Sequence, residues 1–231
     1  MKRDVSKFLT GFRRFQHHYL GARRAHFDRL VKDGQHPRAL VIACCDSRCD
    51  PAVLMDCDPG DMFVVRNVAN LVPPYVQAAS FAATSSAIAF AIRYLEVEHV
   101  IVLGHAQCGG IRALMEHRPV DCDEDRFIGK WLSIAEDARQ KVMENFPQAA
   151  PETRANACEK ASILVSLENL TSYPWIQERL ESGKLLLTGW YFDMLHGDLL
   201  QYDPEAGAFE TLVSSQAGAD TTSHLWWRAP G

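Results

Sequence analysis

The sequence has no long apolar run, no block of like charge and no pair of cysteines separated by two residues. Its first 20 residues carry several basic side chains but no apolar segment that could form a signal-peptide core or cross a bilayer. Lysine and arginine are scattered through a chain of net charge -5, which leaves no basic surface for nucleic acid. We therefore expect a cytoplasmic protein with no membrane span and no nucleic-acid partner.

The cysteine count is odd, which argues against a disulfide framework in a protein expected to stay in a reducing compartment. Some of these thiols are then metal ligands, nucleophiles or buried core residues. A redox centre built from the cysteines at 44, 45, 49 and 108 is a further alternative, but the absence of a CxxC pair argues against it. The seven are Cys44, Cys45, Cys49, Cys57, Cys108, Cys122 and Cys158.

Short apolar runs alternate with longer helix-like segments. Four runs rich in branched side chains are typical of strands buried on both faces: 39–43, 62–65, 100–103 and 184–190. Helical segments are expected between them, at 80–95, 109–117, 127–145 and 156–170. The alternation predicts an α/β fold in which helices flank a central, mostly parallel β-sheet. The length fits one such domain, which we assign to residues 1–213.

Two terminal segments differ from that pattern. Residues 4–32 have apolar side chains at roughly helical spacing, which predicts one or two amphipathic helices in an N-terminal arm, 1–36. At the other end, small polar residues lead to Trp226 and Trp227 in a C-terminal tail, 214–231. The two tryptophans either fold back on the domain or dock against another subunit or protein, since tryptophan is a common anchor at interfaces.

Two clusters of reactive side chains follow predicted strands. Cys44 comes at the end of the first strand, while His105 and Cys108 follow the third. The carboxyl ends of parallel strands are where α/β proteins bind ligands. Each residue taken alone is as readily a core residue, but together they predict one zinc ion per chain. Three protein ligands leave the fourth tetrahedral position to water, which is the pattern of a catalytic site.

Asp46 and Arg48 come directly after the first of these cysteines. A guanidinium that grips a carboxylate with two hydrogen bonds would hold Asp46 off the metal, so that it can accept a hydrogen bond from metal-bound water. Gly109 and Gly110 open a predicted helix whose backbone N–H groups face the metal region and can stabilise a thiolate or an oxyanion. The simpler alternatives are a surface ion pair and a tight turn.

These residues spell the motifs CxDSR and HxxCGG, and with them the sequence resembles the beta-class carbonic anhydrases. The similarity continues through residues 60–75, GDMFVVRNVANLVPPY, and later through Tyr173-Pro174 and Gly189-Trp190. The resemblance implies that the motif cysteines and histidine hold zinc and that the Asp-Arg pair is the catalytic dyad. In this chain the zinc ligands are then Cys44, His105 and Cys108, and the dyad is Asp46 with Arg48.

The resemblance also implies a homo-oligomer. Members of the family form obligate dimers, often paired again as dimers of dimers, in which the N-terminal helices wrap the partner subunit and both chains line the substrate pocket. The implied pocket residues, for carbon dioxide or bicarbonate, are Gln35, Phe63, Val68, Phe90 and Gly109, with Gln35 donating a hydrogen bond to the substrate or product.

Two departures from the family pattern concern the pocket and its regulation. Phe90 stands where plant-like members have tyrosine, so one hydroxyl is missing from the pocket. Some bacterial members bind bicarbonate at a regulatory site of Trp, Arg and Tyr; here only Arg66 remains, with Val41 and Phe192 at the other positions. We therefore expect the plant-like subtype, in which Asp46 stays off the zinc near neutral pH.

The implied reaction is the reversible hydration of carbon dioxide to bicarbonate and a proton, by hydroxide formed at the zinc. Two thiolate ligands should leave the zinc-bound water less acidic than three imidazoles would, so activity should rise on the alkaline side. The alternatives are a zinc hydrolase of carbonyl sulfide or carbon disulfide on the same fold, and a non-catalytic, zinc-stabilised interaction protein. For the departing proton, His36, His99 and His196 are candidates by residue type only.

Overall fold

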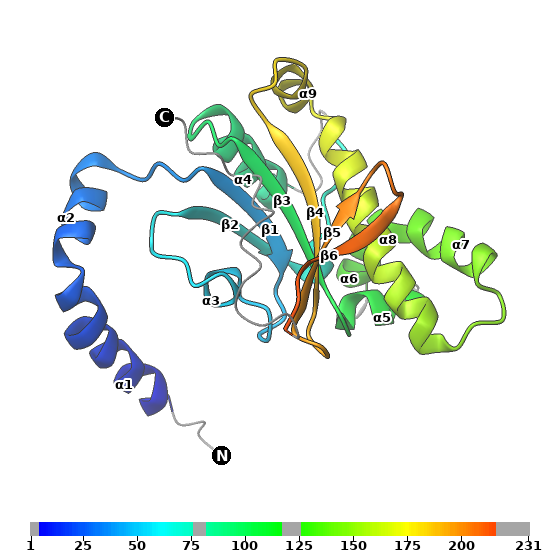
Figure 1. Ribbon diagram of the computed structural model, residues 1–231, viewed down its shortest axis with the longest axis horizontal. Helices are drawn as coiled ribbons and strands as arrows, with labels where there is room; N and C mark the ends of the chain where they lie inside the picture. The colour runs from blue at the N-terminus through cyan, green and yellow to red at the C-terminus, as the bar shows by residue number, and fades with distance from the viewer. Residues whose placement is uncertain (1–4, 76–81, 117–125, 216–231) are drawn as a thin grey trace.

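The computed structural model describes residues 5–75, 82–116 and 126–215. They contain a six-stranded sheet of order β2-β1-β3-β4-β5-β6 (Figure 1). Its strands are β1 (Ala39–Cys44), β2 (Met62–Asn67), β3 (His99–His105), β4 (Leu186–Asp193), β5 (Asp198–Asp203) and β6 (Ala208–Val213). The first four run parallel, and β5 and β6 extend the sheet as antiparallel strands. The expected α/β fold with a mostly parallel sheet is confirmed.

Seven helices in the described residues belong to the body of the domain. They are α3 (Pro51–Leu54), α4 (Ala82–Arg93), α5 (Gly109–Met115), α6 (Arg126–Leu132), α7 (Glu136–Asn145), α8 (Pro151–Thr171) and α9 (Pro174–Glu181). The single helix expected over 127–145 is wrong, because a 3-10 turn, Ser133–Ala135, separates α6 from α7. The short α3 and the proline-initiated α9 were not predicted, since four and eight residues are fewer than the window over which a helical period can be recognised.

The antiparallel strands β5 and β6 were also missed. Every residue of β5 is half-buried, and β6 mixes exposed and half-buried residues without strict alternation. Strands in the interior of a parallel sheet are recognisable as continuous apolar runs. Strands β5 and β6 have neither a continuous apolar run nor a clean alternation of apolar and polar residues.

The main hydrophobic core lies between the sheet and helices α4, α8 and α9. Alternate residues of β1 and β3, including Leu40, Ile42 and Val102, point into it and are fully buried. Helix α8 lies so close to β3 that a Cβ atom on Gly104 would be 2.6 Å from Cδ1 of Ile163. A second buried cluster joins α5, α6, α7 and α8 to the carboxyl ends of β1 and β3. The carboxyl ends of the two strands are thereby held in a rigid frame.

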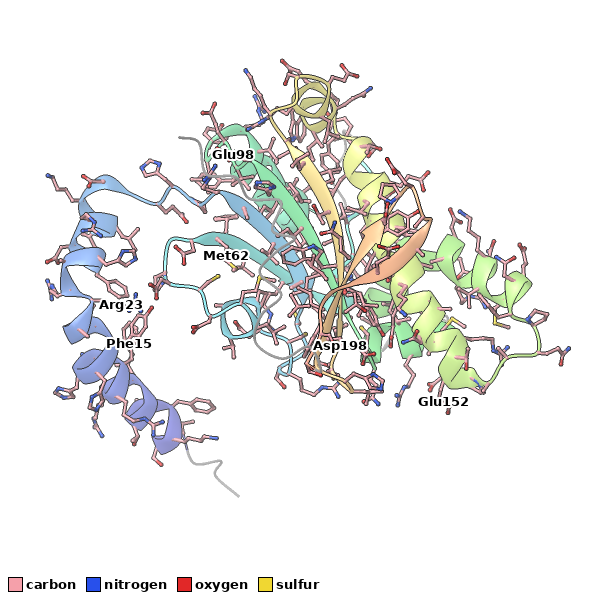
Figure 2. All side chains as sticks on the ribbon, in the orientation of Figure 1. Phe15, Arg23, Met62, Glu98, Glu152 and Asp198 are labelled. Atoms are coloured by element: carbon pink, nitrogen blue, oxygen red, sulfur yellow. The ribbon has the colours of Figure 1, made fainter. Side chains whose placement is uncertain are left out.

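The N-terminal arm consists of α1 (Ser6–Arg14), a π-helical segment (Phe15–Leu20) and α2 (Arg24–Asp33). It lies beside the β2 edge, away from the other helices, as Figure 1 shows. None of the residues in these three segments is buried. Figure 2 labels Phe15 and Arg23 on this arm; Arg23 forms an ion pair with Asp58, and the Tyr19 hydroxyl donates to the same carboxylate at 2.6 Å. The helical character expected of the arm is confirmed.

No helix among the described residues has the length and apolar character needed to cross a bilayer. Strand β6 ends at Val213, next to the proposed boundary between domain and tail, and that boundary stays a prediction. Trp226 and Trp227 of the tail lie outside the described residues.

Candidate metal centre

Three potential zinc ligands meet at the carboxyl ends of β1 and β3. The two strands are parallel neighbours in which Ala43 pairs with Leu103, so Cys44 and His105 come to the same edge of the sheet. The turn after β3 then brings Cys108 beside them. The three ligand atoms lie within 4.8 Å of one another, and all three residues are buried. Ligand atoms around a tetrahedral zinc are about 3.5–4 Å apart, so small side-chain adjustments would close the group on the ion.

The orientation of His105 suits metal binding. Its Nδ1 atom donates a hydrogen bond to the carbonyl oxygen of Ala106 at 2.8 Å. That bond fixes the tautomer and leaves Nε2 as the atom with a lone pair. Nε2 is buried and has no hydrogen-bond partner in the described structure. An unpartnered buried nitrogen beside two cysteine sulfurs is the arrangement a zinc ion satisfies, so the residues present fit the metal.

The sulfur of Cys44 accepts several hydrogen bonds. The thiols of Cys108 and Cys49 lie against it, and the backbone N–H of Asp46 donates to it at 3.4 Å. These contacts, that of Cys108 foremost, hold the pKa of Cys44 well below its usual range. The Cys108 sulfur in turn receives the backbone N–H groups of Gly110 and Ile111 at the start of α5. The Cys44 sulfur and burial nevertheless raise the pKa of Cys108. The pair therefore favours one thiolate, on Cys44, and zinc binding must displace the proton of Cys108.

Gly110 allows the loop after β2 to lie directly on α5. A Cβ atom there would be 2.8 Å from Cγ1 of Val68 and 3.1 Å from Cβ of Ala69, so a larger residue would push the two segments apart. At Gly109 a Cβ atom would meet nothing within 4 Å. The two glycines thus have different roles: Gly110 allows close packing, and Gly109 leaves open space at the metal end of the sheet.

Arg48 grips Asp46 with the two-pronged geometry expected from the sequence. Its Nε donates to Oδ1 at 3.0 Å and its Nη2 donates to Oδ2 at 2.8 Å, and the Arg48 backbone N–H adds a third bond at 3.0 Å. These bonds lower the pKa of Asp46 to about 2. A depressed carboxyl pKa stabilises the fold fully above the ordinary value of 3.8, and the contribution is lost as the pH falls toward 2. The pair is thus intact across the neutral range.

Arginines also hold the two loops of the site in place. Nη2 of Arg48 reaches across to the carbonyl oxygen of Gln107 at 3.1 Å, which ties the loop after β1 to the loop after β3. Arg66 on β2 donates to the carbonyl oxygens of Cys44 at 2.9 Å and Asp46 at 2.6 Å, and pairs with the carboxylate of Asp50. The sequence comparison places Arg66 only at a position of the regulatory site. Because Arg66 lies next to β1, its hydrogen bonds fix the loop after β1 in place.

Glu159 on α8 is part of the site and was missed by sequence reasoning. Its side chain is 5% exposed; Oε1 accepts the backbone N–H of Cys108 at 2.9 Å and Oε2 accepts the hydroxyl of Tyr191 at 2.8 Å. Asn156 donates to the same hydroxyl at 2.7 Å. A signal was available, because Glu159 falls on the buried face of α8 with Ile163, where a charged residue needs partners.

Replacing Glu159 by glutamine should destabilise the protein by about 1–3 kcal/mol, because an amide has one accepting oxygen and can no longer accept from both the Cys108 N–H and the Tyr191 hydroxyl. The melting temperature should fall by about 2–10 °C, and zinc should bind about 10-fold more weakly or worse. Calorimetry and zinc competition would measure the two effects. Glu152→Gln, at the exposed start of the same helix, is the control and should change neither. A Glu159→Gln variant with unchanged zinc affinity would contradict the positioning role.

The expected pocket residues divide into two groups. Val68 and Gly109 lie beside the metal centre. Gln35 precedes β1 and Phe63 lies near the start of β2, so both are at the opposite end of strands that rise about 3.3 Å per residue. Phe90 packs against Phe63 with ring centroids 5.8 Å apart. Within one chain, therefore, Gln35, Phe63 and Phe90 do not meet the zinc ligands.

The three candidate histidines also differ in position. His36 precedes β1 and His99 begins β3, both at the end of the sheet opposite the ligands. In Figure 2 that end is marked by Glu98, and the metal end by Asp198. His196 follows β4 at the metal end, is exposed, and contacts Asp193 through Nδ1 at 2.8 Å, which raises the pKa of the histidine. Of the three, only His196 lies at the metal end of its own chain.

The fold and the site together define a class of protein. A mostly parallel α/β sheet carries, at the carboxyl ends of its strands, a three-ligand zinc site beside an ionised carboxylate. Structural zinc sites are usually closed by four protein ligands, whereas three ligands leave room for a reacting molecule. This is the site of a zinc enzyme.

Comparison with known proteins identifies the family. The carbonic anhydrase family model matches residues 39–199. Beta carbonic anhydrase 5, a chloroplastic protein of Arabidopsis thaliana, is 41% identical over 170 residues, or 74% of this chain and 55% of that protein. The solved structure of the beta-carbonic anhydrase CcaA is 33% identical with a TM-score of 0.85, over 91% of this chain and 93% of that one. A tetrameric beta-carbonic anhydrase of Sordaria macrospora is 25% identical with a TM-score of 0.66, over 90% and 92%.

The chain belongs to the beta-class carbonic anhydrases, the zinc enzymes that hydrate carbon dioxide. It spans about half the length of the Arabidopsis relative and nearly all of the CcaA chain. The cofactor expected from the sequence, zinc, is the metal of this family, and the residues grouped in the structure are the ones the two motifs contain.

Proposed function

We propose that this chain catalyses the hydration of carbon dioxide to bicarbonate and a proton at a zinc ion held by Cys44, His105 and Cys108. The observation that carries the proposal is the buried three-ligand group beside the ionised pair of Asp46 and Arg48. Bound there, zinc would lower the pKa of a water molecule toward neutrality and so supply hydroxide for attack on carbon dioxide.

The surrounding residues orient the reacting groups. Asp46 is fixed by Arg48. Its ionised carboxylate can only accept hydrogen bonds, so its lone pairs orient a hydrogen-bond donor at the reacting centre. The backbone N–H of Gly109, at the open start of α5, can donate to a developing anion. Val68 adds an apolar side chain next to them, which suits a substrate without charge. None of these roles depends on a titratable group other than Asp46, whose charge is constant in the neutral range.

Stopped-flow hydration of carbon dioxide at about pH 8.5, with zinc content determined on the same sample, tests the function. We expect activity that scales with zinc and rises between about pH 6.5 and 9. A flat profile over that range would contradict the role given to ionisation at the metal. If zinc-loaded protein hydrolysed carbonyl sulfide or carbon disulfide but did not hydrate carbon dioxide, the substrate would be one of these sulfur compounds instead. Inactivity toward all three would favour a non-catalytic interaction protein.

We further propose that the working protein is a homodimer, alone or paired again. The apolar face of α1 is bare: Phe8 is 74% exposed, and Leu9 and Phe12 are each 58% exposed. Isolated helices of this length are marginal in water, so a face of this kind is normally buried against a partner. Arms that wrap the partner subunit would cover it. The same arrangement would bring Gln35 and Phe63 of one chain toward the metal of the other and complete the pocket.

Introducing charge on the apolar face of α1 should separate the subunits. We expect the double variant Phe8→Glu, Phe12→Glu to lose the dimer in multi-angle light scattering and to lose most activity while keeping its zinc ligands, because the pocket needs both chains. Thr10→Glu adds charge to the opposite face of the same helix and should stay dimeric. A double variant with wild-type mass and activity would refute the role of the arm.

The cytoplasm is the compartment we propose. Six cysteines in the described residues are free, and two of them are zinc ligands that must stay reduced to bind the metal. A reducing environment keeps such thiols available.

A further inference from the structure

A fourth sulfur lies beside the zinc ligands. Cys49 is 1% exposed and belongs to the same buried cluster as Cys44 and Cys108. Both sulfurs lie against the backbone of Asp46: its N–H donates to the Cys44 sulfur at 3.4 Å, and its carbonyl oxygen accepts from the Cys49 thiol at 3.4 Å. Cys49 is not one of the three residues whose ligand atoms group around a common centre. The metal chemistry therefore leaves this thiol unused.

The loop between the two cysteines is already folded for contact. The backbone N–H of Cys49 donates to the carbonyl oxygen of Asp46 at 3.2 Å, which turns the chain back toward Cys44. Arg66 holds the start of that loop through the carbonyl oxygens of Cys44 and Asp46. A disulfide requires Cα atoms about 4.4–6.8 Å apart and side chains that point toward one another. Two sulfurs held against the same backbone residue, in a loop of six residues, can meet these conditions by side-chain rotation.

We propose that Cys44 and Cys49 are an oxidative modification site, where a hydroperoxide converts the zinc ligand and its neighbour into a disulfide and thereby releases the metal. The proposal rests on zinc at this site but not on the hydration activity. Cys44 is 5% exposed and Cys49 is 1% exposed, so only a small oxidant such as hydrogen peroxide can reach the pair.

The reaction balances with one peroxide for each disulfide. The Cys44 thiolate attacks a peroxide oxygen; an S–O bond forms, the O–O bond breaks, and hydroxide or alkoxide leaves. The Cys49 sulfur then attacks the Cys44 sulfenic acid, so that an S–S bond forms, the S–O bond breaks, and the hydroxyl leaves as water with the Cys49 proton. The two sulfurs lose two electrons in total and the peroxide gains them. The Cys44 sulfur no longer carries the charge that bound zinc.

Neighbouring cysteines are less suited to the second step. Cys108 also touches Cys44, but it is itself a zinc ligand, and its backbone is held by Glu159. Cys45 is exposed and directly follows Cys44, and consecutive side chains at a strand end point to opposite faces. Among the described cysteines, Cys49 is the one outside the metal group whose thiol lies against the same backbone residue, Asp46, as the Cys44 sulfur.

The test treats the zinc-loaded protein with one to a few equivalents of hydrogen peroxide and follows zinc with a colorimetric chelator. We expect about one zinc released per chain and a Cys44–Cys49 disulfide in the peptide map of the alkylated, unreduced digest. Dithiothreitol with added zinc should restore the metal. In Cys49→Ser the Cys44 sulfenic acid lacks its partner and proceeds to sulfinic acid, so less than about a tenth of the released zinc should return on reduction.

Cys57→Ser is the matched control, since Cys57 is a partly buried thiol outside the zinc cluster; it should behave as wild type. A wild-type map that joins Cys44 to Cys108 or to Cys45, or that shows no disulfide, would overturn the proposal. So would a Cys49→Ser protein that binds zinc normally and recovers it fully on reduction. The wild-type map decides the question even if that variant folds poorly.

Discussion

His105→Ala is expected to abolish stable zinc binding and with it carbon dioxide hydration. The imidazole is one of three ligands, and its Nε2 is buried with no other partner in the described structure. Changes to residues that merely support zinc ligands typically cost about 10–100-fold in metal affinity, and loss of a ligand should exceed that range. Metal analysis after dialysis should find less than about one tenth of a zinc per chain. Wild-type protein should retain about one.

Thermal unfolding gives a readout that does not depend on activity. Zinc present at about 1,000 times its dissociation constant stabilises the native state by about 4 kcal/mol, so chelator should lower the melting temperature of the wild type but not of His105→Ala. His99→Ala is the matched control, because His99 begins the strand that His105 ends. It should bind zinc normally. Retention of full zinc by His105→Ala would remove this residue from the ligand set.

Asp46→Asn should lower the hydration rate by about 100-fold or more while leaving zinc bound. Asparagine has nearly the same shape, but it replaces one carboxylate oxygen with an N–H donor and removes the charge that the Arg48 guanidinium grips through two oxygens. Orienting and proton-accepting groups contribute about 100- to 10,000-fold to enzymatic rates. Stopped-flow kinetics on samples of equal zinc content would measure the loss.

A similar ion pair elsewhere in the chain provides a control that separates an effect on the reaction rate from an effect on stability. Arg139 grips Glu136 in a similar two-pronged manner on α7, with Nη2 2.6 Å from Oε1. Glu136→Gln should therefore show a comparable small change in melting temperature and no loss of rate. If Asp46→Asn retained more than about half of the wild-type rate, the carboxylate would have no part in the reaction.

The metal centre was predictable because its residues lie at strand ends. Cys44 and His105 each follow a run of branched apolar residues, and parallel strands bring such ends to one edge. The pairing of Arg48 with Asp46 was predictable as well, since the two residues are almost adjacent in sequence. Local patterns of this kind need no knowledge of long-range packing.

The parts that could not be predicted depend on contacts between distant segments. The pattern of α8 indicates that Glu159 is buried, but its hydrogen bond to Cys108 depends on the packing of that helix on the sheet, and nothing near Cys108 in the sequence indicates it. Strand β5 lacks an apolar period because both of its faces are half-buried. Gln35 and Phe63 lie at the end of the sheet opposite the ligands, so a single subunit does not bring them to the metal, whereas the proposed dimer would.

The ties between the β1 and β3 loops, at Arg48 and Gln107 and through the zinc ligands themselves, bear on how the protein folds. The ligands come from strands far apart in the sequence, so no short segment of the chain can capture zinc with high affinity. Loop-closure entropy must be overcome by pairing of the sheet before the site exists. Zinc should therefore act late, slowing unfolding of the finished domain, and should leave the rate of the first folding steps unchanged.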